Sequence, residues 1–336
     1  MSAKYNYLSE EQVQHFMDKG YVVIKEAFSK EKAADWTKMV WIRLGMDPND
    51  VSTWNKEKVH MPNHRTAALQ EFAPKVWEAM TELLGGEDRI DPKSAVWNDS
   101  FIVNLGTEAL SGPDVHIDPK DLDNWHVDGE WIVHFLDSPE QALLVIPLFS
   151  DIEPRGGGTF ISPDGIDMIA KYLAEHPEGV LPTGLSLTPS TSPYANENHH
   201  LDPHYWSHLE KIRECKIFDE MTGNIGDVVL MHPLMMHSAS KNLTRKQRII
   251  TNPPVSLKEP FCFNRPNKDD YSLVELKTLK ALGVDSLDFH PTTERRRVVP
   301  KRLAMQNKIM EDEKKRLAEY NARLQQENPA KSVSVS

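Results

Sequence analysis

The segment Asn124-Trp-His-Val-Asp-Gly129 carries two side chains that can bind a metal ion, His126 and Asp128. In an extended strand, residues two apart point to the same face, so the imidazole and the carboxylate can approach one ion. Two histidines and one carboxylate on one face of an octahedral ion leave three positions open, a set that suits non-haem iron and O2. The pair alone is weak in a chain with fourteen histidines, so a third ligand must come from elsewhere.

A second cluster of chemically capable residues follows the apolar run Val228–Met231. It contains His232 and His237, and after a polar turn Arg248 begins another apolar run. A hairpin of this kind places an imidazole and a guanidinium in the same cavity. A buried arginine needs an anion, and its planar fork suits a carboxylate. That carboxylate could belong to a ligand or to the protein itself.

The order of these motifs resembles that of the phytanoyl-CoA dioxygenase family of Fe(II)/2-oxoglutarate oxygenases. The likeness runs from about Tyr5 to Pro254. It rests on Leu8-Ser-Glu-Glu-Gln12, Asp18-Lys-Gly-Tyr-Val-Val-Ile24, His126-x-Asp128, the glycine run Gly156–Thr159 with Pro163 beyond, and the block His237, Asn242 and Arg248.

The resemblance implies a double-stranded β-helix, a jelly-roll core that is mainly β with flanking helices. It implies that His126, Asp128 and His237 bind Fe(II), and that Arg248 binds the distal carboxylate of the cosubstrate 2-oxoglutarate. It also implies that Thr159 contacts this cosubstrate and that O2 is consumed. Iron halogenases of this superfamily have a small residue in place of Asp128, so a carboxylate there favours hydroxylation, desaturation or oxidative cyclisation.

Other histidines compete for the role of the third ligand. His232 precedes Pro233, which restricts its backbone, and the family pattern places the ligand directly before the polar turn, which favours His237. We interpret His232 as a core histidine, and His116 and His134 as structural. A group of four histidines in a Pro- and Asn-rich loop lacks strand periodicity and indicates a solvated loop or part of a lid: His199, His200, His204 and His208.

Substrate recognition is the least specific part of the pattern. Arg65 could clamp an acidic group, although a lone arginine is often simply a surface residue. Aromatic residues that could line a pocket are Trp54, Trp125, Trp131 and Trp206, of which we select Trp131 and Trp206 together with Arg65. The function we expect is oxidation of a C–H bond in a small organic molecule of specialised metabolism, with succinate and CO2 as products. One alternative is a non-catalytic jelly-roll metal-binding or sensing protein, which has no need of a carboxylate receptor at Arg248. Another is a zinc hydrolase with the same three ligands, which would be active with zinc and would not depend on 2-oxoglutarate.

The elements that must position these residues change in character along the chain. Ser9 and Gln12 predict a capped helix, followed by a strand over Tyr21–Ile24, a helix after Ser29, a loop over 47–65 and a helix over 74–84. From Ala95 onward, short apolar runs alternate with turn residues, which favours a β-sandwich or barrel over βαβ units. The runs are Phe101–Leu105, Trp131–Leu136, Leu143–Phe149, Thr159–Ser162, Val228–His232 and Arg248–Asn252.

The predicted domain organisation is simple. Residues 1–299 form one oxygenase domain, in which 166–209 is an insertion that could cover the mouth of the barrel. Residues 300–327 form a charged helix whose leucines and methionine recur every seven residues, which permits a homodimer but more simply indicates one stripe lying on the protein body. Residues 328–336 are expected to be disordered.

Composition excludes several classes of partner. The chain of 336 residues carries 39 Lys and Arg against 50 Asp and Glu, a net charge of −11, which argues against duplex nucleic acid and anionic lipid. Two cysteines exclude a disulfide framework and favour a reducing compartment. No apolar run is long enough to cross a bilayer, and the polar start is unlike a signal peptide. We therefore expect a cytoplasmic protein with a small-molecule substrate.

Overall fold

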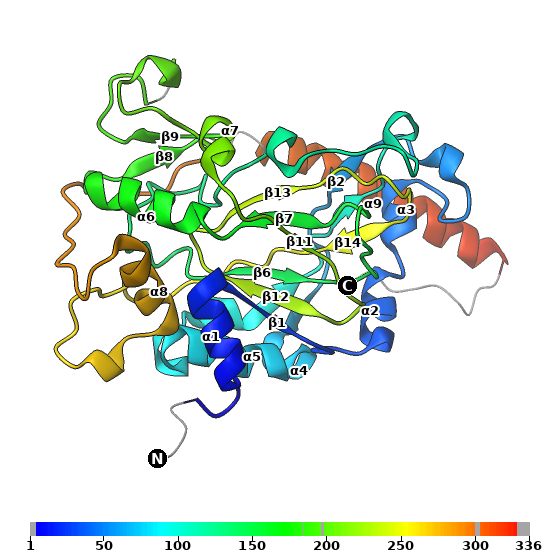
Figure 1. The fold of residues 1–336 in the computed structure, drawn as a ribbon. Helices are drawn as coiled ribbons and strands as arrows, with labels where there is room; N and C mark the ends of the chain where they lie inside the picture. Colours follow the sequence, from blue (N-terminus) through cyan, green and yellow to red (C-terminus); the bar gives the residue numbers. More distant parts are fainter. Residues whose placement is uncertain (1–4, 184, 196–197, 300–302, 328–336) are drawn as a thin grey trace.

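The computed structural model describes residues 5–183, 185–195, 198–299 and 303–327 of the chain. Figure 1 shows the strands at the centre of the molecule, with α1, α4 and α5 below them and α6 and α8 to one side. The helices are α1 (Glu10–Lys19), α2 (Lys30–Thr37), α3 (Val40–Leu44), α4 (Leu69–Phe72), α5 (Pro74–Leu84), α6 (Gly165–Glu175), α7 (His208–Lys211), α8 (Leu273–Leu282) and α9 (Leu303–Glu327).

One sheet of the barrel is built from two antiparallel triplets that join through the end of β6. The bridge between Leu148 and Ile250 and the hydrogen bond from Phe149 N to Ile249 O (2.9 Å) connect them. The resulting order is β1 (Tyr21–Ile24), β12 (Val228–Met231), β6 (Leu144–Pro147), β14 (Arg248–Ile250), β5 (Ile102–Asn104) and β2 (Lys58–His60).

The facing sheet has the order β11 (Asp219–Met221), β7 (Thr159–Ser162) and β13 (Met236–Ala239). The segment at His126 extends it, because His126 and His237 form an antiparallel bridge. From β5 onward the chain crosses repeatedly from one sheet to the other. The first sheet contains β5, β6, β12 and β14, and the facing sheet contains the segment at His126, β7, β11 and β13. Eight such strands in two facing sheets form a jelly roll, which confirms the predicted fold class.

The N-terminal helices cover one face of the first sheet. The predicted capping box is present, because Ser9 accepts from the backbone N–H of Gln12 and the Gln12 side chain accepts from that of Ser9. An aromatic cluster fills the space between these helices and the strands, with the Trp36 ring 4.5 Å from Phe72 and 5.8 Å from Phe149. This apolar contact fixes the helices against the barrel.

Some predicted elements differ from the structure. The run Trp131–Leu136 is not a strand and forms only two isolated bridges, because Ile132 pairs with Arg297 and His134 pairs with Val180, in two separate segments. The predicted loop over 47–65 contains β2. The insertion 166–209 holds α6, the start of α7 and a separate small sheet of β8 (Val180–Pro182), β9 (Ser186–Pro189) and β10 (Trp206–Ser207), and β3 (Thr66–Ala68) pairs with β4 (Val96–Asn98).

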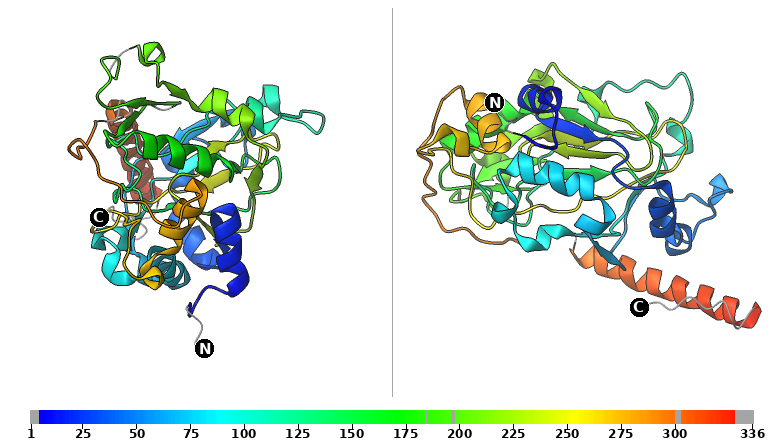
Figure 2. Two further views of the ribbon diagram at one scale, coloured as in Figure 1. Left: turned by 60° about the vertical axis from the view of Figure 1, so that its left-hand side comes forward. Right: turned by 90° about the horizontal axis from the view of Figure 1, so that it is seen from below.

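The C-terminal helix α9 lies on the outside of the molecule, as Figure 2 shows in orange to red. Its residue Leu317 is buried and the helix packs against α3, so at least part of the predicted stripe covers the protein's own body. The side chain of Leu303 and the tail 328–336 lie outside the described residues. No helix in the described part of the chain is both long and apolar enough to cross a membrane.

Candidate metal and cosubstrate site

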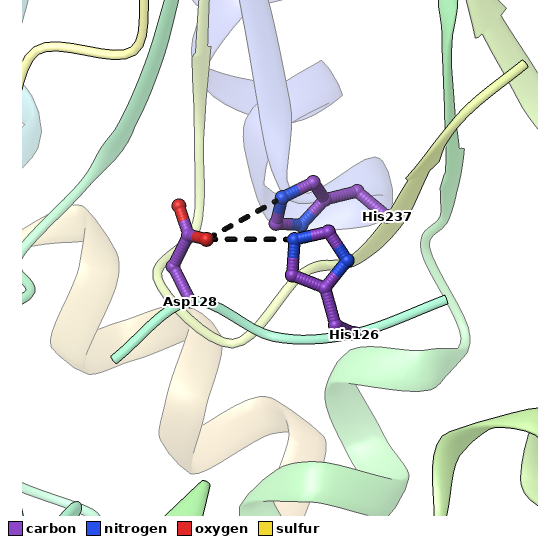
Figure 3. A group of neighbouring side chains, drawn as sticks. All are labelled: His126, Asp128 and His237. Carbon is purple, nitrogen blue, oxygen red and sulfur yellow. Dashed lines mark ion pairs between the residues drawn. The ribbon is translucent and has the colours of Figure 1, made fainter. Parts of the chain in front are cut away.

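His126, Asp128 and His237 converge on one point inside the barrel (Figure 3). The Asp128 Oδ1 atom lies 3.5 Å from His126 Nε2 and 3.9 Å from His237 Nε2. One possible ligand atom from each residue lies within 4.8 Å of the other two. Two nitrogen donors and one oxygen donor at this spacing could bind a single divalent ion.

Backbone contacts orient both imidazole rings toward that point. His126 Nδ1 lies 2.7 Å from the carbonyl oxygen of Asn124, and His237 Nδ1 lies 3.0 Å from that of Met235. A carbonyl oxygen only accepts, so each Nδ1 carries a proton, and in the neutral form of each ring Nε2 holds the lone pair. This is the tautomer that a metal ion requires at Nε2.

The strand pairing explains why residues so far apart in sequence meet here. The backbone groups of His126 and His237 exchange two N–H···O hydrogen bonds of 3.0 Å each, so the two side chains leave the sheet on the same face. Their rings lie 4.3 Å apart between centroids. Asp128 follows two residues after His126 and points to the same face, as the H-x-D spacing predicts.

Burial and charge act differently on the two histidines. Burial opposes protonation of His126, but its hydrogen bond to Asp128 and the charge of that carboxylate outweigh burial, so the pKa of His126 is raised. Burial, together with the nearby positive charge of His126, lowers the pKa of His237 to about 4. His237 is therefore neutral at physiological pH and its Nε2 lone pair is available.

Arg248 lies deep in the same cavity and is only 1% exposed. Its Nε donates to the carbonyl oxygen of Gly157 at 2.6 Å, and its Nη1 lies 3.5 Å from the carbonyl oxygen of Ile102. No acidic side chain of the described residues forms an ion pair with it. Burial lowers the pKa of Arg248 to about 10, so the guanidinium remains a cation at neutral pH. A buried cation without a protein counter-ion could bind an anion.

The glycine run supports Arg248 rather than only giving room to a ligand. Gly157 has φ +83°, and a Cβ there would lie 2.8 Å from Asn104 Nδ2 and 2.9 Å from Asn242 Cβ. The run is therefore packed closely against two buried asparagines, Asn104 at the end of β5 and Asn242 between β13 and β14. Its Gly157 carbonyl holds the Arg248 side chain in place.

A cavity of about 900 Å³ contains the triad and Arg248. Thr159 also lines it, beside Ala239 in the pairing of β7 with β13. Lys58 also lines the cavity. It was not predicted from the sequence, because it falls in the segment 47–65 that was predicted to be a loop. In the register of β2, β5 and β14, Lys58 and Arg248 both lie opposite Asn104, so these three side chains share one face. The only signals in the sequence were a polar Asn104 inside an apolar run and the polar–apolar alternation around Val59.

The three residues selected for substrate binding divide between two locations. Trp131 lines the cavity, whereas Arg65 and Trp206 do not, so for these two the prediction of a pocket position was wrong. Arg65 pairs with Asp35 (2.7 Å) on the outside of the molecule, which is the alternative role of a surface arginine. Trp206 packs against Tyr172, with ring centroids 5.9 Å apart.

Trp54 and Trp125 are also absent from the cavity wall. Trp54 stacks on Trp41 at 5.3 Å. Trp125 is fully buried, and its Nε1 donates to the carbonyl oxygen of Pro119 at 2.8 Å. Both are structural, because an indole N–H that meets a backbone carbonyl is satisfied within the core.

His232 and His208 are not among the residues that line the cavity. His232 is buried, accepts at Nδ1 from the backbone N–H of Leu234 (3.2 Å) and contacts Thr278 Oγ1 through Nε2 (3.0 Å), as expected of a core histidine. His208 is fully buried, which contradicts a solvated loop at that position. None of the described residues of the insertion 166–209 is among those that line the cavity. Part of this segment forms its own small sheet of β8, β9 and β10, and its role as a lid stays a prediction.

No family profile matches this sequence, and no curated protein matches it. Among solved structures, HygX from Streptomyces hygroscopicus with nickel, 2-oxoglutarate and hygromycin B bound has 12% identity and a TM-score of 0.41, covering 75% of this chain and 88% of that chain. The epimerase SnoN from nogalamycin biosynthesis has 16% identity and a TM-score of 0.38, with 85% and 95% covered.

EctD from S. alaskensis with 2-oxoglutarate and 5-hydroxyectoine has 16% identity and a TM-score of 0.38, covering 76% of this chain and 77% of that chain. Each of the three TM-scores is below 0.5 and each identity is below 25%. Neither the fold nor the chemistry of this chain follows from such likenesses, and its resemblance to the phytanoyl-CoA dioxygenase family stays a prediction.

Proposed function

We propose that this protein is an Fe(II)/2-oxoglutarate-dependent oxygenase that oxidises a C–H bond of a small organic molecule. The observation that carries the proposal is Arg248, a buried guanidinium without an acidic partner among the described residues. It lies in the same cavity as a triad of two histidines and one carboxylate. A metal site and an anion receptor in one cavity fit a cosubstrate that is a dianion and chelates the metal at its other end.

The residues present fit both groups. His126, Asp128 and His237 would hold Fe(II), since their donor atoms and tautomers suit it and leave further coordination positions open. Arg248 would bind the distal carboxylate of 2-oxoglutarate, with Thr159 and Lys58 facing the same space. Bound together, iron and 2-oxoglutarate supply O2 activation, with succinate and CO2 as products.

The rest of the cavity would hold the substrate and limit access of water. Its inner wall is apolar at Ile102 and Ile250, and Trp131 adds an aromatic face. A volume of about 900 Å³ is near the upper end of small-molecule sites, so it can contain 2-oxoglutarate and a second organic molecule together. The chain's contribution to the reaction is then placement of the substrate C–H bond beside the metal.

Arg248 also weighs against the two alternative functions. A non-catalytic metal-binding protein gains nothing from a desolvated cation near its ion, and burying that cation without a partner costs stability. A zinc hydrolase with the same three ligands has no need for a dianion receptor. Such a hydrolase would be active with zinc alone and would not require 2-oxoglutarate.

Removal of single ligands tests the metal assignment. We expect His126→Ala and Asp128→Ala to abolish iron-dependent formation of succinate from 2-oxoglutarate, with unchanged circular dichroism. The matched control is His290→Ala, because His290 lies on the surface with its side chain 79% exposed. Full turnover in both ligand variants would refute the assignment.

Arg248 tests the cosubstrate assignment separately. A buried charge-assisted hydrogen bond contributes about 1.5–3 kcal/mol, so Arg248→Met should raise the 2-oxoglutarate concentration needed for half-maximal binding by roughly 10- to 150-fold. Arg248→Lys keeps the charge but not the planar guanidinium, so its half-maximal 2-oxoglutarate concentration should lie between those of the wild type and Arg248→Met. Manganese binding without 2-oxoglutarate, measured by electron paramagnetic resonance, should be retained in both variants. An unchanged 2-oxoglutarate requirement in Arg248→Met would show that the anion binds elsewhere.

A further inference from the structure

Two residues of the C-terminal helix α9, Gln306 and Ile309, line the same cavity as the triad. The predicted domain layout treated this helix as an addition to the oxygenase domain, and the triad itself lies between residues 126 and 237. The helix nevertheless forms part of the cavity wall. Trp131 and Arg297 also line this cavity, and the backbone next to Arg297 is tied to Trp131 by the hydrogen bond from Val298 N to Trp131 O (2.7 Å).

A buried charged cluster lies on the same face of α9, one turn beyond Ile309. Glu313 is only 1% exposed. Its Oε2 accepts from Arg43 Nε at 2.8 Å and lies 2.9 Å from His64 Nε2. Arg43 in turn pairs with Asp99 at 2.7 Å and donates to the carbonyl oxygen of Pro62. Breaking one member of a buried cluster leaves an uncompensated charge, so these contacts strongly favour one position of the helix.

The junction between α3 and α9 is shaped for close contact. Arg316 Nε donates to the carbonyl oxygen of Arg43 at 2.7 Å. Gly45, with φ +69°, ends α3, and a Cβ at this glycine would lie 2.9 Å from Arg316 Cδ. Leu317 is buried beside these contacts. The helix is thus held by polar and apolar contacts on the turns that follow the cavity-lining residues.

We infer that Gln306 and Ile309 are specificity-determining residues of the substrate pocket and that the buried contacts of Glu313 position them. The inference rests on the proposed function, which makes this cavity the substrate pocket. Ile309 adds an apolar surface and Gln306 adds an amide that can donate and accept. The substrate class is therefore an amphipathic organic molecule that extends from the metal toward α9, with an apolar part and a hydrogen-bonding group.

A fluorescent reporter tests the position of α9 without any catalysis. Ile309→Cys, labelled with bimane in a Cys262→Ser background, should be quenched by Trp131 across the cavity. The native Cys215 is buried, and burial raises the pKa of its thiol to about 11, which keeps it unreactive. We expect Trp131→Phe to raise the bimane emission at least about twofold, because indole quenches bimane only at short range. A bimane label at Glu311→Cys, on the exposed face, is the control and should not respond to Trp131→Phe. An equal lack of response at position 309 would overturn the placement of Ile309 in the cavity wall.

The role of the charged cluster is tested with the same reporter. Glu313→Gln should relieve quenching at position 309, whereas Glu311→Gln makes the same chemical change on the exposed face and should not. His64→Gln, which removes only one contact of Glu313, is a second variant if Glu313→Gln fails to fold. Quenching that persists in both Glu313→Gln and His64→Gln would show that these contacts do not position the helix.

The specificity role is tested by 2-oxoglutarate-dependent succinate formation with a panel of ring-containing acids, amides and alcohols. For the largest compounds that stimulate succinate formation, Ile309→Trp should raise the concentration needed for half-maximal stimulation at least about tenfold. Ile309→Ala should extend stimulation to larger compounds. The control Glu311→Trp should match the wild-type protein. An unaltered profile in both Ile309 variants would overturn the inference. If the wild-type protein formed no succinate, the proposed function and the specificity role would both fail, while the reporter would still decide whether α9 forms a wall of this cavity.

Discussion

The two histidines of the triad gain their ligand geometry from main-chain atoms two residues earlier. In both cases Nδ1 meets the carbonyl oxygen of residue i−2, Asn124 for His126 and Met235 for His237. The orientation of each ring is thus local, and it does not depend on a further side chain that a substitution could remove. His232 shows the opposite arrangement, because its Nδ1 accepts from Leu234 N and leaves the proton on Nε2, directed at Thr278.

His232 makes a prediction about the pH dependence of stability. Burial, and then the positive charge of Lys277, lowers its pKa from 6.5 to about 3. The unfolded chain takes up a proton below pH 6.5, whereas the folded protein does not until about pH 3. The stability contribution is therefore complete above pH 6.5 and is lost as the pH falls toward 3.

In urea unfolding of the metal-free protein, we expect the free energy of unfolding to fall with decreasing pH more steeply in the wild type than in His232→Gln. The difference in slope between pH 6 and 4 should approach about 1.4 kcal/mol per pH unit. The variant should be less stable than the wild type at pH 7. Parallel curves for the two proteins would contradict a neutral, buried His232.

At the scale of elements, the edge of one sheet and one tight loop create the proposed anion receptor. The pairing of β2 with β5 and of β5 with β14 sets Lys58, Asn104 and Arg248 in one row. Asn104 Nδ2 donates to the carbonyl oxygen of Ser240 at 3.0 Å, which ties this row to the end of β13 in the facing sheet. The loop before β7 then supplies the Gly157 carbonyl that holds Arg248.

Gly157→Ala should disturb this arrangement in two ways. The added Cβ would meet Asn104 and Asn242 at under 3.0 Å, and the residue would keep φ +83°. We expect the unfolding free energy to fall by about 2 kcal/mol or more. The 2-oxoglutarate requirement should rise, because the Gly157 carbonyl that accepts from Arg248 would be displaced.

The control is Gly283→Ala, which shares a positive φ (+71°) but has no atom within 4 Å of the added Cβ. Urea unfolding should show a loss of about 1 kcal/mol there, with no change in a 2-oxoglutarate titration. Equal effects of the two substitutions would indicate backbone strain alone and would exclude the proposed contact role of Gly157.

At the scale of the whole molecule, the jelly roll closes its two sheets around the site, and the proposed metal ligands come from both halves of the chain. His126 and Asp128 precede β6, and His237 lies in β13. An ion bound to all three therefore links segments that are separate in the unfolded chain. A ligand that binds only the folded state stabilises it in proportion to the logarithm of its concentration.

We expect manganese(II) with 2-oxoglutarate to raise the midpoint of thermal unfolding. With the limiting ligand a hundredfold above its Kd, the stabilisation should be about 2.7 kcal/mol. His237→Ala, which removes the ligand from the second half of the barrel, should abolish the shift, while His290→Ala should keep it. A shift of wild-type size in His237→Ala would mean that manganese binds elsewhere.

Local chemistry was readable in the sequence wherever a pattern repeats within a few residues. The capping box at Ser9, the strand at Tyr21–Ile24 and the shared face of His126 and Asp128 all depend on the period of a helix or strand, which neighbouring residues determine. The resemblance to a known family then named His237 and Arg248, which the structure brings into the same cavity.

Only the tertiary structure decided which distant segments border the cavity. Lys58 sits in a strand of three residues, whose alternation around Val59 is too short to distinguish a strand from a loop. Ile309 belongs to a charged helix that from its sequence could have lain anywhere on the surface. Arg65 and Trp206 have suitable chemistry but lie outside the cavity. Long-range pairing and the buried contacts of Glu313 determine these positions, and such contacts join residues whose separation along the chain leaves no local signature.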